Sequence, residues 1–159
     1  MKLRILADAD EPVLTGLLTN DQIKQTYMLP DFPRREDALP LARRLMALSR
    51  EESRFVRGMD EDGTLVGFLN DVEIHDDTIE LGYVVHPEHC GQGYATAALQ
   101  LAIAQLFQAG YRKVLCGAFE ENTASIRVME KAGMHRLETS GEIEYRGKFR
   151  RCVYFAMTL

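Results

Sequence analysis

The sequence predicts an α+β (mixed α/β) fold over residues 1–159: a single domain with a central, mostly antiparallel mixed sheet and helices on both faces. Segments with strand and helix periodicity follow one another in the order β-α-α-β-β-β-α-β-α-β-β. Short turns between strands favour antiparallel pairs, whereas the strand–helix–strand unit of residues 78–119 favours one right-handed parallel crossover. A content of 46% apolar and 27% charged residues is typical of one soluble globular domain with a buried core.

In the first half of the chain, proline and aspartate mark the helix starts. Asp8 or Asp10 can cap the first helix, and Pro12 suits its first turn. Pro40 is tolerated only in the early turns of the second helix. The expected elements of the whole chain are a strand at 2–7, a helix at 11–18, an irregular segment at 23–37, a helix at 35–52, strands at 53–60, 65–76 and 78–85, a helix at 91–109, a strand at 112–119, a helix at 122–133 and two terminal strands.

In the second half, turn residues and apolar spacing mark the elements. The Asp-Gly pair in "EDGT" predicts a hairpin turn between two strands. The helix at 91–109 has apolar residues at Leu99 and at the positions three, four, seven and eight residues further on, and Gly110 closes it. "RKVLCGAF" indicates a buried strand, and Gly133 closes the helix that follows.

The stretch "HPEHCGQGYATAALQLAI", residues 86–103, enters a helix through two glycines and without a Ser, Thr or Asp cap. The first four N–H groups of a helix have no intrahelical partner, so a glycine-flanked, uncapped entrance suits an anion. The amides of residues 91–96 would form a concave set of donors for a pyrophosphate. Neither a Walker loop nor a GxGxxG motif is present, and a simple tight turn is the alternative interpretation.

Composition argues against several other classes of protein. The net charge of −5 predicts no bulk attraction to nucleic acid, and the basic run "RGKFRR" is interpreted as a solvated hairpin. The N-terminus predicts a strand and not a signal peptide, and no apolar run is long enough to span a membrane. Three widely spaced cysteines and four histidines without ligand spacing predict no disulfide framework, no metal site and a reducing cytoplasm.

Two motifs about 30 residues apart resemble those of a known superfamily. "GYVVHPEHCGQGYATAAL" and "NTASIRVMEKAGM" are together similar to the motifs of the GNAT superfamily of acyl-CoA-dependent N-acetyltransferases. The similar branch is that of the ribosomal-protein N-terminal acetyltransferases. The resemblance extends over nearly the whole chain in element order and is weak before residue 50. It implies a GNAT-like fold, acetyl-CoA as the acyl donor and no metal.

The resemblance implies which residues bind acetyl-CoA. Backbone amides of the glycine loop would hold the phosphates, the strand before it would pair with the pantetheine arm, and one strand amide would steady the acetyl oxygen. Cys90 stands where the family has Arg or Gln, so cofactor binding is expected to persist with an altered affinity. The implied cofactor-binding residues are Val84, Val85, Cys90, Gly91, Gln92, Gly93, Tyr94, Ala95, Thr96 and Asn122.

The resemblance also implies catalytic and acceptor residues. An ammonium cannot attack a thioester, so a carboxylate or a water chain has to collect its proton. Glu80 is the candidate base, with Glu73 in reserve, and Ser125 is the candidate acid for the departing thiolate. Tyr27 is expected to line the acceptor site. The alternatives are structural: an exposed strand carboxylate for Glu80 and a packed loop aromatic for Tyr27.

The predicted activity is transfer of an acetyl group from acetyl-CoA to a primary amine, by direct attack in a ternary complex. The acceptor is a small-molecule amine or a protein N-terminus, and no nucleic acid or membrane partner is expected. Family analogy alone suggests a homodimer through the terminal strands. The alternative function is a catalytically inactive acyl-CoA-binding sensor or interaction module.

Overall fold

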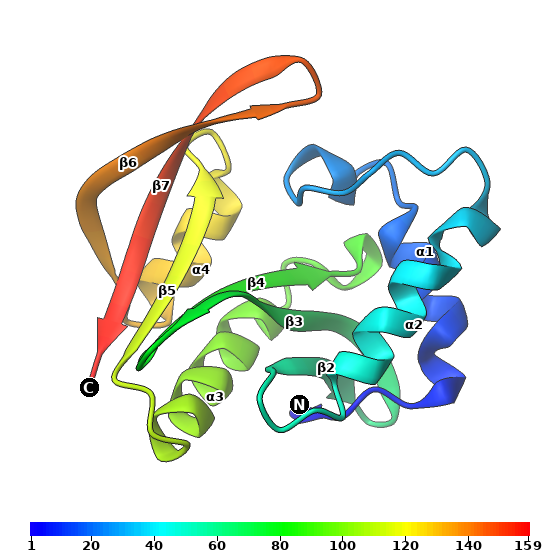
Figure 1. Ribbon diagram of the computed structural model, residues 1–159, viewed down its shortest axis with the longest axis horizontal. Coiled ribbons are helices and arrows are strands. Elements are labelled where there is room, and N and C mark those ends of the chain that lie inside the picture. The colour runs from blue at the N-terminus through cyan, green and yellow to red at the C-terminus, as the bar shows by residue number, and fades with distance from the viewer. The chain divides into compact units, whose positions relative to one another are not determined.

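The structure is a computed structural model that describes residues 1–159. Its seven strands belong to one sheet with the order β1-β2-β3-β4-β5-β7-β6 (Figure 1). The strands are β1 (Lys2–Arg4), β2 (Val56–Glu61), β3 (Thr64–His75), β4 (Thr78–Val85), β5 (Lys113–Phe119), β6 (His135–Tyr145) and β7 (Lys148–Thr158). The α-helices are α1 (Glu11–Leu18), α2 (Leu39–Leu48), α3 (Tyr94–Gln108) and α4 (Thr123–Lys131).

Strand pairing follows the predicted pattern. β4 and β5 run parallel, joined by the crossover that contains α3. The pairs β1–β2, β2–β3, β5–β7 and β6–β7 are antiparallel. The mostly antiparallel mixed sheet with one parallel crossover is therefore confirmed. The β2–β3 hairpin turns at Asp62 and Gly63, whose φ angles of +50° and +85° are those of the Asp-Gly turn that the sequence predicts.

Contacts divide the chain into two compact units. The first consists of residues 1–70 and 83–94, and the second of residues 71–82 and 95–159. In the first unit, α1 and α2 pack against each other (Figure 1). The apolar side of each helix faces one buried cluster, which is why both helices have periodic leucines. The buried members of the cluster are Leu6, Leu14, Leu17, Leu18, Ile23, Leu29, Ala38, Ala42, Leu45, Met46, Leu48, Val56, Leu65, Phe68 and Val84.

In the second unit, α3 buries most of the stripe that its apolar spacing predicts, whereas Phe107 is only half-buried. Gly110 follows the helix with a φ of +104°, a conformation that favours glycine and that ends the helix. α4 contacts β5 and β6, and the β6–β7 hairpin continues the sheet beyond β5 (Figure 1). The buried residues of α3 are Ala98, Leu99, Ala102, Ile103 and Leu106.

The first strand is shorter than predicted, ending at Arg4 instead of residue 7. The Leu6 N–H donates to the Ser49 Oγ (3.0 Å), and the Ala7 N–H donates to the Asp10 carboxylate (2.7 Å). Neither N–H is left to continue a strand ladder. The Asp10 carboxylate is occupied in this way and makes no capping hydrogen bond to α1.

Two helices are also shorter than predicted. The helix expected over 35–52 is α-helical only over Leu39–Leu48, and Arg35–Ala38 form a 3₁₀ turn before it. Pro40 lies in the first turn, because proline lacks the N–H that a later position would need. The helix expected over 91–109 begins at Tyr94, since the two glycines before it have positive φ angles that no α-helix contains.

The basic run "RGKFRR" is only partly the solvated hairpin that we expected. The Arg150 guanidinium lies 3.8 Å from the centre of the Phe119 ring and pairs with Glu121. The Phe119 and Tyr145 rings stack with centroids 5.9 Å apart. These contacts anchor the β6–β7 hairpin to the end of β5, so at least one cation of the run has a structural partner.

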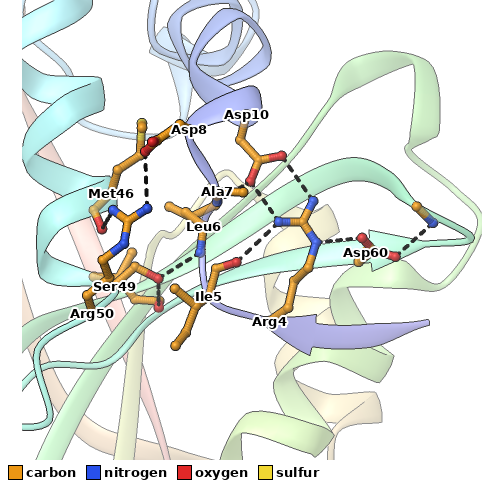
Figure 2. Close-up of polar contacts among 12 residues, drawn as sticks. Arg4, Ile5, Leu6, Ala7, Asp8, Asp10, Met46, Ser49, Arg50 and Asp60 are labelled. Atoms are coloured by element: carbon orange, nitrogen blue, oxygen red, sulfur yellow. Dashed lines mark hydrogen bonds and ion pairs between the residues drawn. The ribbon is translucent and has the colours of Figure 1, made fainter.

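A group of ion pairs joins β1, β2 and the start of α1 (Figure 2). The Arg4 guanidinium donates to Asp60 (2.5 Å) and to both carboxylate oxygens of Asp10 (2.7 and 3.0 Å). Asp60 and Asp10 are both buried. The Arg4 side chain lowers the pKa of Asp60, and the Gly63 N–H lowers it further. The ionised form of Asp60 is therefore favoured in the folded protein.

We expect Asp60→Asn to lower the free energy of unfolding at pH 7 by about 1–3 kcal/mol, because Arg4 loses a charged partner. The folded pKa of Asp60 is depressed, so its contribution is present above the ordinary carboxyl pKa of about 3.9 and is lost as the pH falls toward the lower folded pKa. Urea denaturation at pH 7 and pH 3 measures both effects. Asp8→Asn is the matched control: its carboxylate is 92% exposed and pairs with Arg50, so a change below about 0.5 kcal/mol is expected.

None of the helices has the length and apolar character that crossing a membrane requires. No group of three or more His, Cys, Asp or Glu side chains lies together in a way that could hold a metal ion.

Candidate active site

The glycine loop, residues 86–93, leads from β4 into α3. Gly91 and Gly93 have φ angles of +78° and +83°, which favour glycine over other residues. A Cβ at either position would meet no atom within 4 Å, and residues 90–93 are exposed. The N–H groups of residues 91–93 make no hydrogen bond within the protein. Together with the uncapped start of α3, they form an open set of donors that can hold a pyrophosphate.

The end of β4 is held close to β3. A Cβ on Gly67 would overlap the Val84 carbonyl oxygen, so a glycine is required where the two strands approach. The His86 N–H donates to the Val66 carbonyl (2.8 Å). The Val84 side chain is buried in the core of the first unit, whereas Val85 is half-buried. Any contact of Val84 with a cofactor therefore has to come from its backbone.

The predicted residues Asn122 and Ser125 lie at the start of α4. The Asn122 Oδ1 accepts a hydrogen bond from the Ser125 N–H (3.2 Å) and so caps the helix. The cap gives a structural reason for the spacing of Asn122 and Ser125, which lie three residues apart at the start of the helix. The Asn122 Nδ2 group keeps its donors available for a ligand.

Glu80 lies on β4 in the second unit, where it is the register partner of Leu115 in β5. Its carboxylate makes no hydrogen bond or ion pair. Burial raises the pKa of Glu80, and the negative charge of Glu73 raises it further. An unpaired carboxylate with a raised pKa is the kind of group that collects a proton during catalysis.

Tyr154 on β7 is the cross-strand partner of Gly117 on β5. A Cβ on Gly117 would lie 2.9 Å from the Tyr154 Cε1 atom and 3.4 Å from the Glu80 Oε1 atom. The tyrosine ring and the carboxylate therefore line the same space above Gly117. Burial raises the pKa of the Tyr154 hydroxyl, and Cys152 and Glu80 raise it further. Sequence reasoning missed Tyr154, Cys152 and Gly117. The only signal was an isolated tyrosine in the otherwise apolar "CVYFAM".

Tyr27 has the contacts of a packed side chain. Its hydroxyl donates to the Asn70 Oδ1 (2.7 Å), and its ring meets the Phe68 ring edge-on at 6.0 Å. Burial raises the pKa of Tyr27. These contacts match the structural alternative, and an acceptor-lining role remains a prediction. The predicted residues are divided between the units: Tyr27, Val84, Val85 and residues 90–94 belong to the first, and Glu80, Ala95, Thr96, Asn122 and Ser125 to the second.

Comparison with known proteins assigns the family. The family model described as "Acetyltransferase (GNAT) domain" matches residues 1–135. The chain therefore belongs to the GNAT acetyltransferase family. It is an acyl-CoA-dependent N-acetyltransferase, and acetyl-CoA is its acyl donor.

Individual relatives agree with this assignment. YoaA, an uncharacterized N-acetyltransferase of Bacillus subtilis (strain 168), is 26% identical over 140 residues, which cover 84% of this chain and 78% of YoaA. The structure of spermidine N-acetyltransferase from Vibrio cholerae in complex with CoA and spermine has a TM-score of 0.82 at 18% identity, covering 99% and 94% of the chains. Ribosomal-protein-alanine N-acetyltransferase from Brucella melitensis has a TM-score of 0.79 at 16% identity, covering 100% of both chains. The two solved structures show the shared fold.

Proposed function

We propose that the enzyme transfers the acetyl group of acetyl-CoA to a primary amine by direct attack, with both substrates bound at once. The observation that carries this proposal is Glu80: a carboxylate without a protein partner, whose pKa is raised by burial and by Glu73. A lysine-type amine with a pKa of about 10.4 is almost entirely protonated at pH 7. A base that collects this proton is what direct attack requires.

In the proposed reaction, the amine nitrogen attacks the thioester carbonyl carbon and forms the new N–C bond. Before the attack, the ammonium form of the amine gives one proton to the Glu80 carboxylate, which releases it to solvent. The proton that the nitrogen loses on forming the amide then passes to Glu80 as well. The C–S bond breaks, and the CoA sulfur takes a proton from the Ser125 hydroxyl, which solvent then reprotonates. The products are the N-acetylated amine and free CoA.

We further propose that the backbone donors of residues 91–96 bind the pyrophosphate of acetyl-CoA. The unpaired N–H groups of the glycine loop and the open space in front of both glycines support this role. The backbone of Val84 and Val85 would pair with the pantetheine arm, and the Asn122 Nδ2 group would donate to it. The side chains of Gln92, Tyr94 and Thr96 would flank the phosphates.

For the acceptor, we propose an amine that is cationic in solution. The side chains of Glu73 and Glu80 interact closely enough for one charge to raise the pKa of the other, and together they would attract an ammonium group. The names of the two solved relatives suggest the chemical range to test: a polyamine and a protein N-terminus.

An acceptor screen tests this function. Release of free thiol from acetyl-CoA is measured with spermine, with a peptide that begins with alanine, and with ethylamine, and mass spectrometry identifies the N-acetylated product. Initial rates at varied concentrations of both substrates should give intersecting double-reciprocal lines, as a ternary complex requires. Parallel lines would indicate an acyl-enzyme and would contradict direct transfer.

Cys90→Ala is expected to keep most of kcat, with any loss appearing as a raised KM for acetyl-CoA. Partial desolvation raises the pKa of the Cys90 thiol, so little thiolate is available as a nucleophile. The thiol lies 3.6 Å from the His86 carbonyl oxygen and 3.8 Å from that of Val85, and neither acceptor is a base. Intact-protein mass spectrometry after mixing with acetyl-CoA alone should find no acetyl adduct. A Cys90 adduct that an amine then discharges would replace direct transfer by a two-step mechanism.

A further inference from the structure

The hydroxyl of Tyr154 has no partner in the protein. It makes no hydrogen bond, although the residue is half-buried and its ring lies near glycines of both neighbouring strands. The Cε1 edge of the ring lies over Gly117 on β5, and the hydroxyl lies 3.6 Å from the position that a Cβ on Gly141 of β6 would occupy. Partly buried tyrosines usually direct the hydroxyl at a hydrogen-bond partner. The ring edge lies near the unpaired Glu80 carboxylate, and the charge of Glu80 acts on the Tyr154 hydroxyl, which suggests that one ligand completes both groups.

Gly117 lies beneath the Tyr154 ring and near the Glu80 carboxylate. At Gly117, any side chain would collide with the ring, because the Cβ would lie 2.9 and 3.1 Å from two ring atoms. Gly117 itself is exposed, so solvent reaches the sheet surface beside the ring. The Tyr154 ring therefore covers the backbone of Gly117, and the Glu80 carboxylate lies at the edge of this contact.

We propose that Tyr154 binds the acceptor amine, with its hydroxyl oxygen accepting one N–H while the Glu80 carboxylate accepts another. This inference rests on the proposed role of Glu80. A neutral primary amine has two N–H groups and one lone pair. When each N–H is bonded to an oxygen, the lone pair remains directed at the thioester carbon, so the two side chains orient the nucleophile as well as binding it.

This arrangement predicts a preference for primary over secondary amines. A secondary amine has a single N–H and can satisfy only one of the two oxygens. Ethylamine and dimethylamine are isomers that differ in the number of N–H groups. A difference between their rates therefore cannot be due to a difference in atomic composition. Tyr154 should therefore contribute to the reaction of ethylamine and little to that of dimethylamine.

Tyr154→Phe tests the proposal, because it removes the hydroxyl and keeps the ring. We expect kcat/KM for ethylamine to fall about five- to tenfold, the value of one hydrogen bond, and the ethylamine-to-dimethylamine ratio to fall by the same factor. The KM for acetyl-CoA and the thermal midpoint should not change, as they would if the tyrosine were only structural. An unchanged ratio overturns the role of Tyr154. A wild-type enzyme that acetylates neither isomer faster than buffer also overturns it.

Two further sets of variants separate this proposal from the role of Glu80. Glu80→Gln should slow the acetylation of both isomers. If it does so while Tyr154→Phe leaves the ethylamine-to-dimethylamine ratio unchanged, the role of Tyr154 is rejected and that of Glu80 is kept. Gly117→Ala should displace the ring and reduce kcat/KM for ethylamine more than Gly141→Ala does, since a Cβ at Gly141 would meet the ring only at ordinary contact distances of 3.6 and 3.7 Å. Equal effects of the two glycine variants would contradict the placement of the ring in the acceptor site.

Discussion

Glu80→Gln is expected to lower kcat by about a hundredfold at pH 7, with little change in the KM for acetyl-CoA. Glutamine has nearly the same shape but cannot collect the proton of the attacking amine. The change is not expected to reduce stability. Burial raises the folded pKa of Glu80, so the ionised carboxylate destabilises the fold above its ordinary pKa, and a neutral amide removes this cost. Thermal unfolding at pH 7 therefore separates lost catalysis from lost structure.

The pH profile gives the sharper test of Glu80. The ionised carboxylate of Glu80 is the active form, so kcat/KM should rise with pH as Glu80 ionises. Because the pKa of Glu80 is raised, this rising limb of the pH profile should lie at higher pH than for an ordinary carboxyl group. Glu73→Gln removes the neighbouring negative charge and should shift the limb to lower pH. Ser125→Ala should lower kcat and leave the limb where it is. Wild-type activity of Glu80→Gln across the pH range would return Glu80 to a structural role.

Gly93→Asp is expected to abolish most of the stabilisation by acetyl-CoA. A ligand at a hundredfold excess over its Kd raises the free energy of unfolding by about 2.7 kcal/mol, and a hundredfold weaker Kd reduces this to about 0.4 kcal/mol. The aspartate would add a negative charge and a side chain in the open space in front of the loop amides, where the pyrophosphate is proposed to lie. Thermal shift with acetyl-CoA and the KM for acetyl-CoA measure the loss.

Gly110→Asp is the matched control for this substitution. Gly110 also has a positive φ, +104°, and a Cβ there would also meet nothing within 4 Å, so the backbone strain and the added charge are comparable. It lies at the other end of α3, away from the glycine loop. We expect a lower melting temperature but a normal shift with acetyl-CoA. If Gly93→Asp keeps the wild-type shift, the pyrophosphate does not bind at residues 91–96.

The features that could be predicted from the sequence are those with a local cause. The Asp62–Gly63 turn, the closure of α3 at Gly110 and the positive φ angles of the glycine loop follow from backbone preferences of single residues. The apolar stripe of α3 follows from a spacing of three and four residues. The two motifs that indicated an acetyltransferase are also local, because a helix entrance binds a phosphate through its own backbone.

The limits of sequence reasoning are clearest at helix ends and in the first strand. α2 starts late because Arg35–Ala38 form a 3₁₀ turn, and β1 stops early because a side chain distant in the sequence accepts from the Leu6 N–H. That side chain is Ser49: its Oγ accepts from the Leu6 N–H and donates to the Val56 carbonyl (2.8 Å), and so joins the end of α2 to two other segments (Figure 2). No local preference could have indicated such a partner.

By itself, then, the sequence determined the element types, the glycine loop before α3 and the family. Only the tertiary structure decided which side chains share the space near the candidate base. Strand β7 lies between β5 and β6, and its register places Tyr154 opposite Gly117, beside Glu80 of β4. Strand order and register depend on burying whole faces of the sheet at once, and a shift of one residue would turn Tyr154 to the other face. The electrostatic interaction between Glu80 and Tyr154 is therefore a property of the whole sheet and not of either segment.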